Sequence, residues 1–301
     1  MRTHRPVTAA AFVSAALILP GCFDSSSSPV GPGNDSTDDS AIRFEMDQQA
    51  ALTDPEVFVY DTGTPVSGAP IATDTWRRQL VTLDKTIQIT LNYPQGEPPT
   101  ANVTVQANAS GILHLFVRTG ELGEFTKDWS DQGVRSLFFR RGNASGDSSA
   151  DDAKGNGERG RGWRLVSMSG VLAQSPKTTR HINSVRIQDG DIDRTITNVT
   201  DLVPIEDLIS LPPNTTATIT VDTGDATDQV YLHLRWRQAR LKLVGKGDGT
   251  FSGAFETGPR GGARHLGVDV LSQGTLFDDT APYDNIVWGI PYRVGPLTPV
   301  S

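Results

Sequence analysis

The 301-residue chain contains a single cysteine, six lysines and eight glutamates. With one cysteine, no disulfide can form within the chain. The 27 Asp outnumber the eight Glu, and the 21 Arg outnumber the six Lys. Because Asp favours turns and Glu favours helices, the chain is poor in helix-forming residues. The longest apolar run, residues 7–19, is too short to cross a bilayer as a helix. The composition therefore predicts a globular, all-β protein.

Sequence motifs of the best-marked enzyme classes are also missing. The chain has no Gly-x-Ser-x-Gly, His-Glu-x-x-His, P-loop or Cys-x-x-Cys pattern. This weakens the hypothesis of an enzyme, although a polysaccharide hydrolase needs only two carboxylates that the fold brings together. The formal net charge is −8 without a long run of Lys or Arg, which argues against a nucleic-acid partner. No cofactor is expected, apart from the calcium considered below.

The N-terminus has the pattern of a secretory signal. Arg2 and Arg5 precede the apolar run, which ends in Leu19-Pro20-Gly21-Cys22. This ending resembles the lipobox of bacterial lipoproteins, in which a small residue precedes a cysteine that is acylated and becomes the new N-terminus. The resemblance covers residues 1–22 only, and Pro20 is a less usual residue at its position. It implies that Cys22 is lipidated; the alternative is an ordinary signal cleaved nearby, with an incidental cysteine.

The resemblance also predicts a location. In that family the cysteine carries several acyl chains, and two or more chains give a stable anchor. The residue after Cys22 is Phe23 rather than the Asp that usually retains such proteins at the inner membrane. We therefore expect a cell-envelope protein, lipid-anchored at the outer membrane or cell surface. Residues 23–40 contain almost no residue that could be buried and are expected to be a flexible tether, followed by an N-terminal extension at 41–75.

Apolar and polar residues alternate in short runs from residue 80 onward, which predicts strands. Several runs recur in the same order, and their recurrence suggests a tandem duplication. The expected equivalents are Thr86–Leu91 with Thr195–Val199, Val103–Ala107 with Ile219–Thr223, and Ile112–Val117 with Tyr231–Trp236. Copies of this size predict two immunoglobulin-like β-sandwich domains, 76–188 and 189–301, although the Cys…Trp…Cys pattern is absent. A Gly-, Ser- and Asp-rich stretch at 142–162 is expected to be an insertion. The one plausible helical stretch is Val203–Leu211, which Pro204 limits to a turn or two.

A few residues are candidates for metal or ligand binding. Asp278, Asp279 and Asp284 lie in one acidic stretch that could wrap a Ca²⁺ ion, although an acidic turn without metal is favoured. His114 and His233 each lie between two leucines in a strand, and are interpreted as structural. Arg240 belongs to an expected exposed strand face with Arg235 and Arg237. Five tryptophans could form a platform for sugars, although core packing is the default for such residues.

These observations favour a membrane-anchored envelope lipoprotein that acts as a non-catalytic surface or binding module. Its ligand would be a glycan or a protein at the cell surface. The alternatives are a secreted polysaccharide-acting hydrolase and a carbohydrate-binding module. A cleft with two facing carboxylates would favour the hydrolase, and a flat row of exposed indoles would favour sugar binding.

Overall fold

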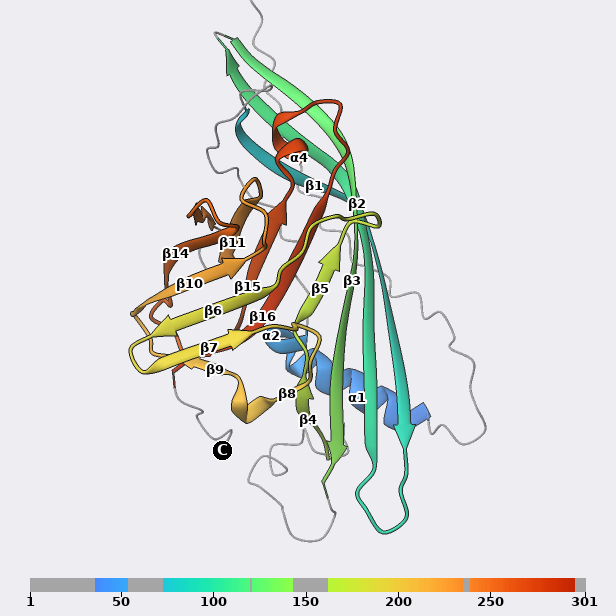
Figure 1. Ribbon diagram of the computed structural model, residues 1–301. Coiled ribbons are helices and arrows are strands. Elements are labelled where there is room, and N and C mark those ends of the chain that lie inside the picture. The colour runs from blue at the N-terminus through green and yellow to red at the C-terminus, as the bar shows by residue number, and fades with distance from the viewer. Residues whose placement is uncertain (1–35, 54–72, 120, 143–161, 235–238, 296–301) are drawn as a thin grey trace, which may run out of the picture. The chain divides into compact units, whose positions relative to one another are not determined.

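The structure is a computed structural model that describes residues 36–53, 73–119, 121–142, 162–234 and 239–295 (Figure 1). Cys22, the expected signal segment and nearly all of the stretch 142–162 lie outside the described residues. The described residues belong to one compact unit. Its helices are short, and the protein is all-β, as the composition predicts. The helices of the described ranges are α1 (Ser36–Gln48), α2 (Ala50–Thr53), α4 (Gln273–Phe277) and a 3-10 turn, η2 (Ile205–Asp207).

The described strands form two sheets, and the larger sheet has eleven strands. Its main path runs β1 (Thr73–Asn92), β2 (Thr100–Thr119), β3 (Glu121–Arg141), β5 (Val171–Gln174), β16 (Asn285–Val294), β15 (Gly262–Leu271), β11 (Gln229–Leu234) and β12 (Ala239–Lys242). Three short strands lie off this path: β4 (Trp163–Met168), β8 (Val203–Pro204) and β9 (Ile209–Leu211). The pairings are antiparallel except that of β9 with β16, which is parallel.

The smaller sheet has five antiparallel strands and packs on one face of the larger sheet. Its order is β13 (Val244–Gly245), β14 (Thr250–Glu256), β10 (Thr216–Asp222), β6 (Ser184–Asp189) and β7 (Ile192–Ile196). Alternate residues such as Ile187 and Ile219 point inward and meet Val268 and Trp288 of the larger sheet in one buried cluster. These two layers form a β-sandwich.

The larger sheet also curves, so that its two ends meet on the face away from the smaller sheet. Trp76 near the start of β1 contacts Tyr231 of β11, with ring centroids 5.3 Å apart. Arg240 of β12 donates from Nη1 to the Trp76 carbonyl at 3.2 Å. A second cluster, which includes Leu113 and Val287, fills this space together with residues of α4. The curved sheet therefore encloses a second interior.

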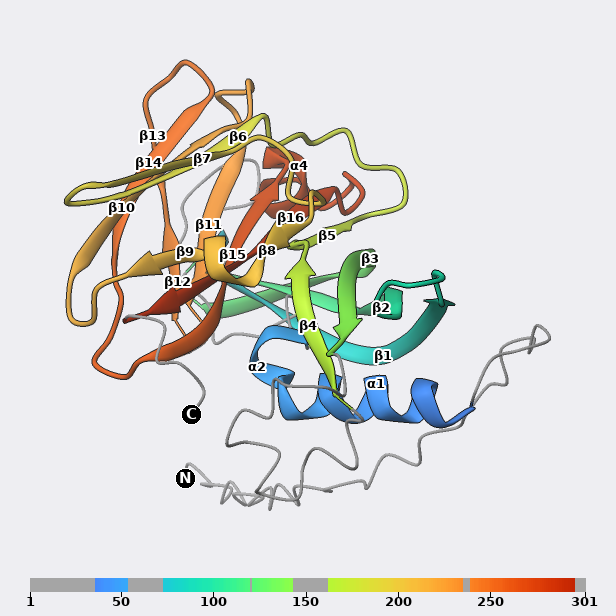
Figure 2. The ribbon, with the colours of Figure 1, turned by 90° about the horizontal axis from the view of Figure 1, so that it is seen from below.

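Helix α1 covers the other part of the same face, across β1 to β4 (Figure 2). Ala41, Ile42 and Met46 lie on one side of the helix and pack into a third buried cluster. Asp38, in the first turn, accepts hydrogen bonds from Tyr93 at 2.7 Å and from the Trp163 indole at 3.2 Å. The expected tether is therefore corrected at its end, because residues 36–40 are helical. Within the described ranges, no helix is both long and apolar enough to span a membrane.

The strand pairing corrects the expected division into domains 76–188 and 189–301. The boundary falls at the end of β6, and β6 pairs with β7 and β10 across it. In the larger sheet, β5 from the first half pairs with β16 from the second. Two immunoglobulin-like domains in tandem are thus not confirmed; the strands of both halves are interleaved.

The expected repeat does not give equivalent strands either. Val103–Ala107 and Ile112–Val117 lie in the single strand β2. Of their supposed equivalents, residues 219–222 lie in β10 and residues 231–234 in β11, and these two strands belong to different sheets. Thr-Val alternation, common to β-strands, accounts for the similarity. The expected helical stretch Val203–Leu211 is helical for a single 3-10 turn, η2, which follows Pro204, and its two ends are the strands β8 and β9.

Candidate functional site

A group of charged side chains lies inside the curve of the larger sheet, and Asp269 of β15 is at its centre. Arg78 of β1 donates to both carboxylate oxygens, at 2.8 and 3.1 Å. His233 of β11 lies 2.8 Å from Oδ2 through Nε2, and Asn285 of β16 donates to Oδ1 at 3.0 Å. All four residues are buried. One carboxylate therefore joins strands from both ends of the sheet.

Strand alternation explains how a charge reaches this position. Val268 and Val270 point into the sandwich core, so Asp269 between them points into the second interior. Burial alone would raise the pKa of Asp269. The charge of Arg78 and the hydrogen bond from His233 outweigh burial and hold this pKa well below its usual range. Burial likewise disfavours the Arg78 cation, but the attraction of Asp269 raises its pKa, so the two form a charged pair.

Arg240 lies beside this pair rather than on an exposed face. Its guanidinium is 3.5 Å from the centroid of the Trp76 ring, a cation–π contact, and the residue is 5% exposed. The expected exposed strand face is therefore wrong for Arg240. The other two arginines of that expectation, Arg235 and Arg237, lie outside the described residues.

Asp131 of β3 is a second buried carboxylate in this interior. Tyr283 donates its hydroxyl to Oδ2 at 3.0 Å, and Oδ1 is buried with no hydrogen-bond partner among the described residues. Burial raises the pKa of Asp131 to about 6, against the opposing effects of the Arg78 charge and the Tyr283 hydrogen bond. Asp131 therefore changes its protonation state near neutral pH, which Asp269 does not.

The acidic stretch that was the calcium candidate belongs to the segment Ser272–Asp284, which we call the α4 loop. Asp278 accepts from the amide and hydroxyl of Thr280 at 2.9 and 2.7 Å, which closes a turn, and Asp279 is exposed. Lys127 of β3 extends its ammonium group to three carbonyls of the loop. It donates to Gly274 at 3.0 Å, to Ala281 at 2.9 Å and to Asp278. A protein cation thus satisfies oxygens that could otherwise ligate a metal.

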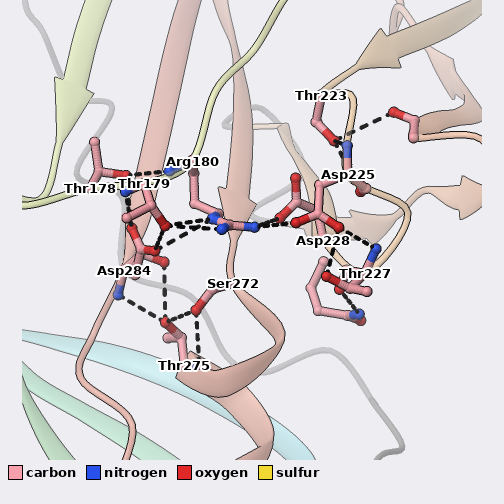
Figure 3. Close-up of polar contacts among 12 residues, drawn as sticks. Thr178, Thr179, Arg180, Thr223, Asp225, Thr227, Asp228, Ser272, Thr275 and Asp284 are labelled. Atoms are coloured by element: carbon pink, nitrogen blue, oxygen red, sulfur yellow. Dashed lines mark hydrogen bonds and ion pairs between the residues drawn. The ribbon is translucent and has the colours of Figure 1, made fainter.

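Asp284 lies apart from the other two candidates, in a group of three carboxylates around Arg180 (Figure 3). Arg180 donates from Nη1 to Asp225 at 2.8 Å and to Asp228 at 2.6 Å, and its Nε lies 3.4 Å from Asp284. Thr178 and Thr179 donate their hydroxyls to the two Asp284 oxygens at 2.8 and 2.7 Å. Three loops, which precede β6, β11 and β16, are joined in this way.

The electrostatics of this group differ from one carboxylate to the next. Hydrogen bonds from the Thr227 amide and hydroxyl, together with Arg180, lower the pKa of Asp225 to about 2. Asp228 is buried, and burial raises its pKa against the effect of Arg180. The guanidinium therefore partly compensates three carboxylates and fixes the loops that carry them.

Both histidines of interest lie in strands and point away from their leucine neighbours, as expected. His233 contacts Asp269, whereas His114 of β2 contacts Glu124 through Nδ1 and Gln79 through Nε2, the latter at 2.9 Å. The two environments are different, so the positions are not equivalent. In the part of the chain that the structure describes, no three His, Cys, Asp or Glu side chains are grouped to hold a metal ion.

Four of the five tryptophans are in the core. Trp76, Trp129, Trp163 and Trp288 are at most 5% exposed, and Trp236 lies outside the described residues. Among the described tryptophans there is no exposed platform for sugars. The default interpretation of core packing is confirmed for these four.

The sequence does not single out Arg78, Asp131 or Asp269. The one available signal is a charged residue inside an apolar alternating run, such as Asp269 between two valines. That signal does not show what packs against the Asp269 side of β15. The contact partner there, Arg78, lies about 190 positions away in the sequence. No protein-family model matches the chain, and no curated protein matches it at a significant level of sequence similarity.

Proposed function

We propose that this protein is a cell-envelope lipoprotein, anchored through Cys22, whose body is a non-catalytic surface or binding module. The observation that carries the proposal is the placement of the only cysteine. It follows Gly21 directly, at the end of an apolar run of signal-peptide length. A chain with one thiol placed there has a ready position for a lipid anchor and none for a disulfide.

The interior of the body supports a binding or structural role. Charged side chains of the body bond across strands and loops: Asp269 to Arg78, Arg180 to three carboxylates, and Lys127 to three backbone carbonyls. Groups used in this way hold loops in one arrangement on a rigid scaffold. Such loops are where β-sandwich proteins commonly bind ligands. A glycan or a protein at the cell surface is the ligand class that suits the location.

The anchor is tested by Cys22→Ala in cells that express the full chain. We expect the variant to lose incorporation of a labelled fatty acid, and either to leave the membrane fraction or to remain unprocessed. Ser25→Ala, three residues further along, is the matched control and should behave as the wild type. Unchanged acyl labelling of Cys22→Ala would refute the anchor.

The non-catalytic role has its own test. One observation favours a hydrolase: Asp131 has the raised pKa of a general acid, and the ionised Asp269 acts on it electrostatically. Both carboxylates are buried, at 2% and 0% exposure, which is why we favour binding. Purified protein is incubated with isolated envelope polysaccharide. Release of reducing ends that is lost in Asp131→Asn would replace our proposal with the hydrolase.

A further inference from the structure

The α4 loop is held to β3 by three side chains that alternate along the strand. Lys127, Trp129 and Asp131 point to the same face of β3. Lys127 donates hydrogen bonds to three carbonyls of the loop. Trp129 packs against the Tyr283 ring, with ring centroids 6.2 Å apart, and Asp131 accepts a hydrogen bond from the Tyr283 hydroxyl. The last of these contacts is the one that involves a group able to change its charge near neutral pH.

We propose that Asp131 and Tyr283 form an acid-set latch on the α4 loop, closed when the Asp131 carboxyl is protonated and weakened when it is ionised. The geometry gives the reason. An ionised Asp131 keeps a buried oxygen, Oδ1, without a hydrogen-bond partner among the described residues. Both forms accept the Tyr283 hydroxyl, but the ionised form also buries a charge with this single hydrogen bond, which is costly, whereas the neutral acid buries no charge.

The groups that face Asp131 do not remove this cost. Arg78 from β1 attracts its charge, Asp269 from β15 repels it, and Tyr283 donates one hydrogen bond. Along β3 the next charged side chains on the same face are Lys127 and Arg135. Lys127 is occupied by the α4 loop, and Arg135 donates to the carbonyls of Leu52 and Ser169 at 2.6 and 3.1 Å.

The sign of the pH effect follows from burial. In the closed loop, burial raises the pKa of Asp131 to about 6 from an ordinary value of 3.8. The closed state therefore binds a proton more tightly than an open state, in which the carboxyl meets water. The closed loop loses stability as the pH rises from about 4 through about 6, and is weakest relative to the open loop above that range.

The latch is placed to affect the three loops of Figure 3. Tyr283 is followed directly by Asp284, whose oxygens bond to Thr178, Thr179 and Arg180. A contact from β1, Thr73 to the Leu276 carbonyl at 2.6 Å, holds the earlier part of the loop and has no titratable group. Opening is therefore expected at the Tyr283 end, next to the Arg180 group.

Hydrogen exchange of the full-length protein in detergent tests the latch. Amide protection in peptides that cover residues 276–285 is measured at about pH 5 and about pH 7.5, and corrected for the intrinsic pH dependence of exchange. We expect about a tenfold loss of protection at the higher pH. Asp131→Asn, which stays neutral, should keep high protection at both values. Asp279→Asn, an exposed residue of the same loop, is the matched control and should keep the wild-type loss.

Two outcomes would overturn the latch. One is a wild-type protein with equal protection at both pH values, and the other is an Asp131→Asn protein that keeps the wild-type loss. If Asp131→Asn does not fold, Tyr283→Phe decides together with the wild-type profile. It removes the hydroxyl that bonds Tyr283 to Asp131, so its protection at about pH 5 should fall below that of the wild type at the same pH. Wild-type protection in Tyr283→Phe at both values would also refute the proposal.

Discussion

At the scale of single residues, Asp269 has the most demanding environment in the protein. Its carboxylate is fully buried, yet it receives hydrogen bonds from Arg78, His233 and Asn285. A buried ion pair adds little stability compared with an apolar pair of the same shape, because both charges lose their hydration. Removing one partner is different, since it leaves the other charge buried and uncompensated. The role of Asp269 is therefore to supply the counter-charge of the buried Arg78 guanidinium.

We expect Asp269→Asn to lower the free energy of unfolding by about 3–5 kcal/mol, because Arg78 then has no counter-charge. Urea unfolding at neutral pH measures the loss. Asp279→Asn, at an exposed position, is the control and should change stability by no more than about 0.5 kcal/mol. Because the folded protein lowers the pKa of Asp269, its contribution is present above about pH 4 and is lost as the pH falls below that. A loss under about 1 kcal/mol would contradict the assigned role.

At the scale of elements, strand β1 shows why the sequence indicates only part of a strand. Up to Leu80, the inward residues are even-numbered, as with Trp76; further along they are odd-numbered, as with Ile87 and Ile89. The change occurs at a β-bulge between Leu80 and Thr82, where Val81 is the extra residue. A bulge breaks the period of two, so the alternation predicts the run from Ile87 but not the twenty-residue strand.

The sequence does not predict helix α1, for a related reason. Its first residues are Ser, Thr and Asp, a composition typical of a tether, and its buried side is formed mainly by Ala41, Ile42 and Met46. Three apolar residues are too few to give a clear repeat of apolar residues at helical spacing. The helix is stabilised by packing against β-strands that come later in the chain, so tertiary contacts decide a segment that local propensity leaves undecided.

Gly111 of β2 lies opposite the β1 bulge and allows the two backbones to approach. A Cβ atom at this position would be 1.8 Å from the Gln79 carbonyl oxygen, which also accepts the Trp129 indole at 3.2 Å. We expect Gly111→Ala to destabilise the fold by at least about 1–3 kcal/mol, as measured by thermal or urea unfolding. Gly123→Ala in β3, where the nearest atom is 3.8 Å away, is the control and should have a much smaller effect. Equal effects of the two variants would show that the close approach is not the cause.

At the scale of the whole molecule, the sequence predicts the class of the fold but not its connectivity. Alternating runs such as Val103–Ala107 identify strands correctly. Which strands pair is decided by contacts between distant segments, and a period of two contains no information about partners. The same holds for the interior, where Arg78 and Asp269 are 191 residues apart. The apparent repeat followed from alternation alone, and the pairing of β5 with β16 and of β6 with β10 contradicts it.

The interleaved pairing predicts that the body unfolds as one unit and that neither half folds alone. A fragment of residues 189–301 would lack β6 and β5, and with them the buried Val185, Ile187 and Ala173. It would also expose the face of β16 that points into the second interior, where Val287 packs. In the whole protein, every residue of β16 is buried. Each large apolar side chain uncovered costs about 1.5–3 kcal/mol, so a few of them exceed the roughly 5–15 kcal/mol that stabilises a domain.

Circular dichroism and tryptophan fluorescence of the full chain should therefore give coincident urea transitions. Fragments 36–188 and 189–301, expressed separately, should show no cooperative transition, whereas the intact chain, purified and measured in the same way, is the control. Separate transitions in the full chain, or a cooperative transition in either fragment, would restore two independent domains. Coincident transitions with two unfolded fragments would confirm that β16, between β5 and β15, joins the two halves of the chain into one cooperative unit.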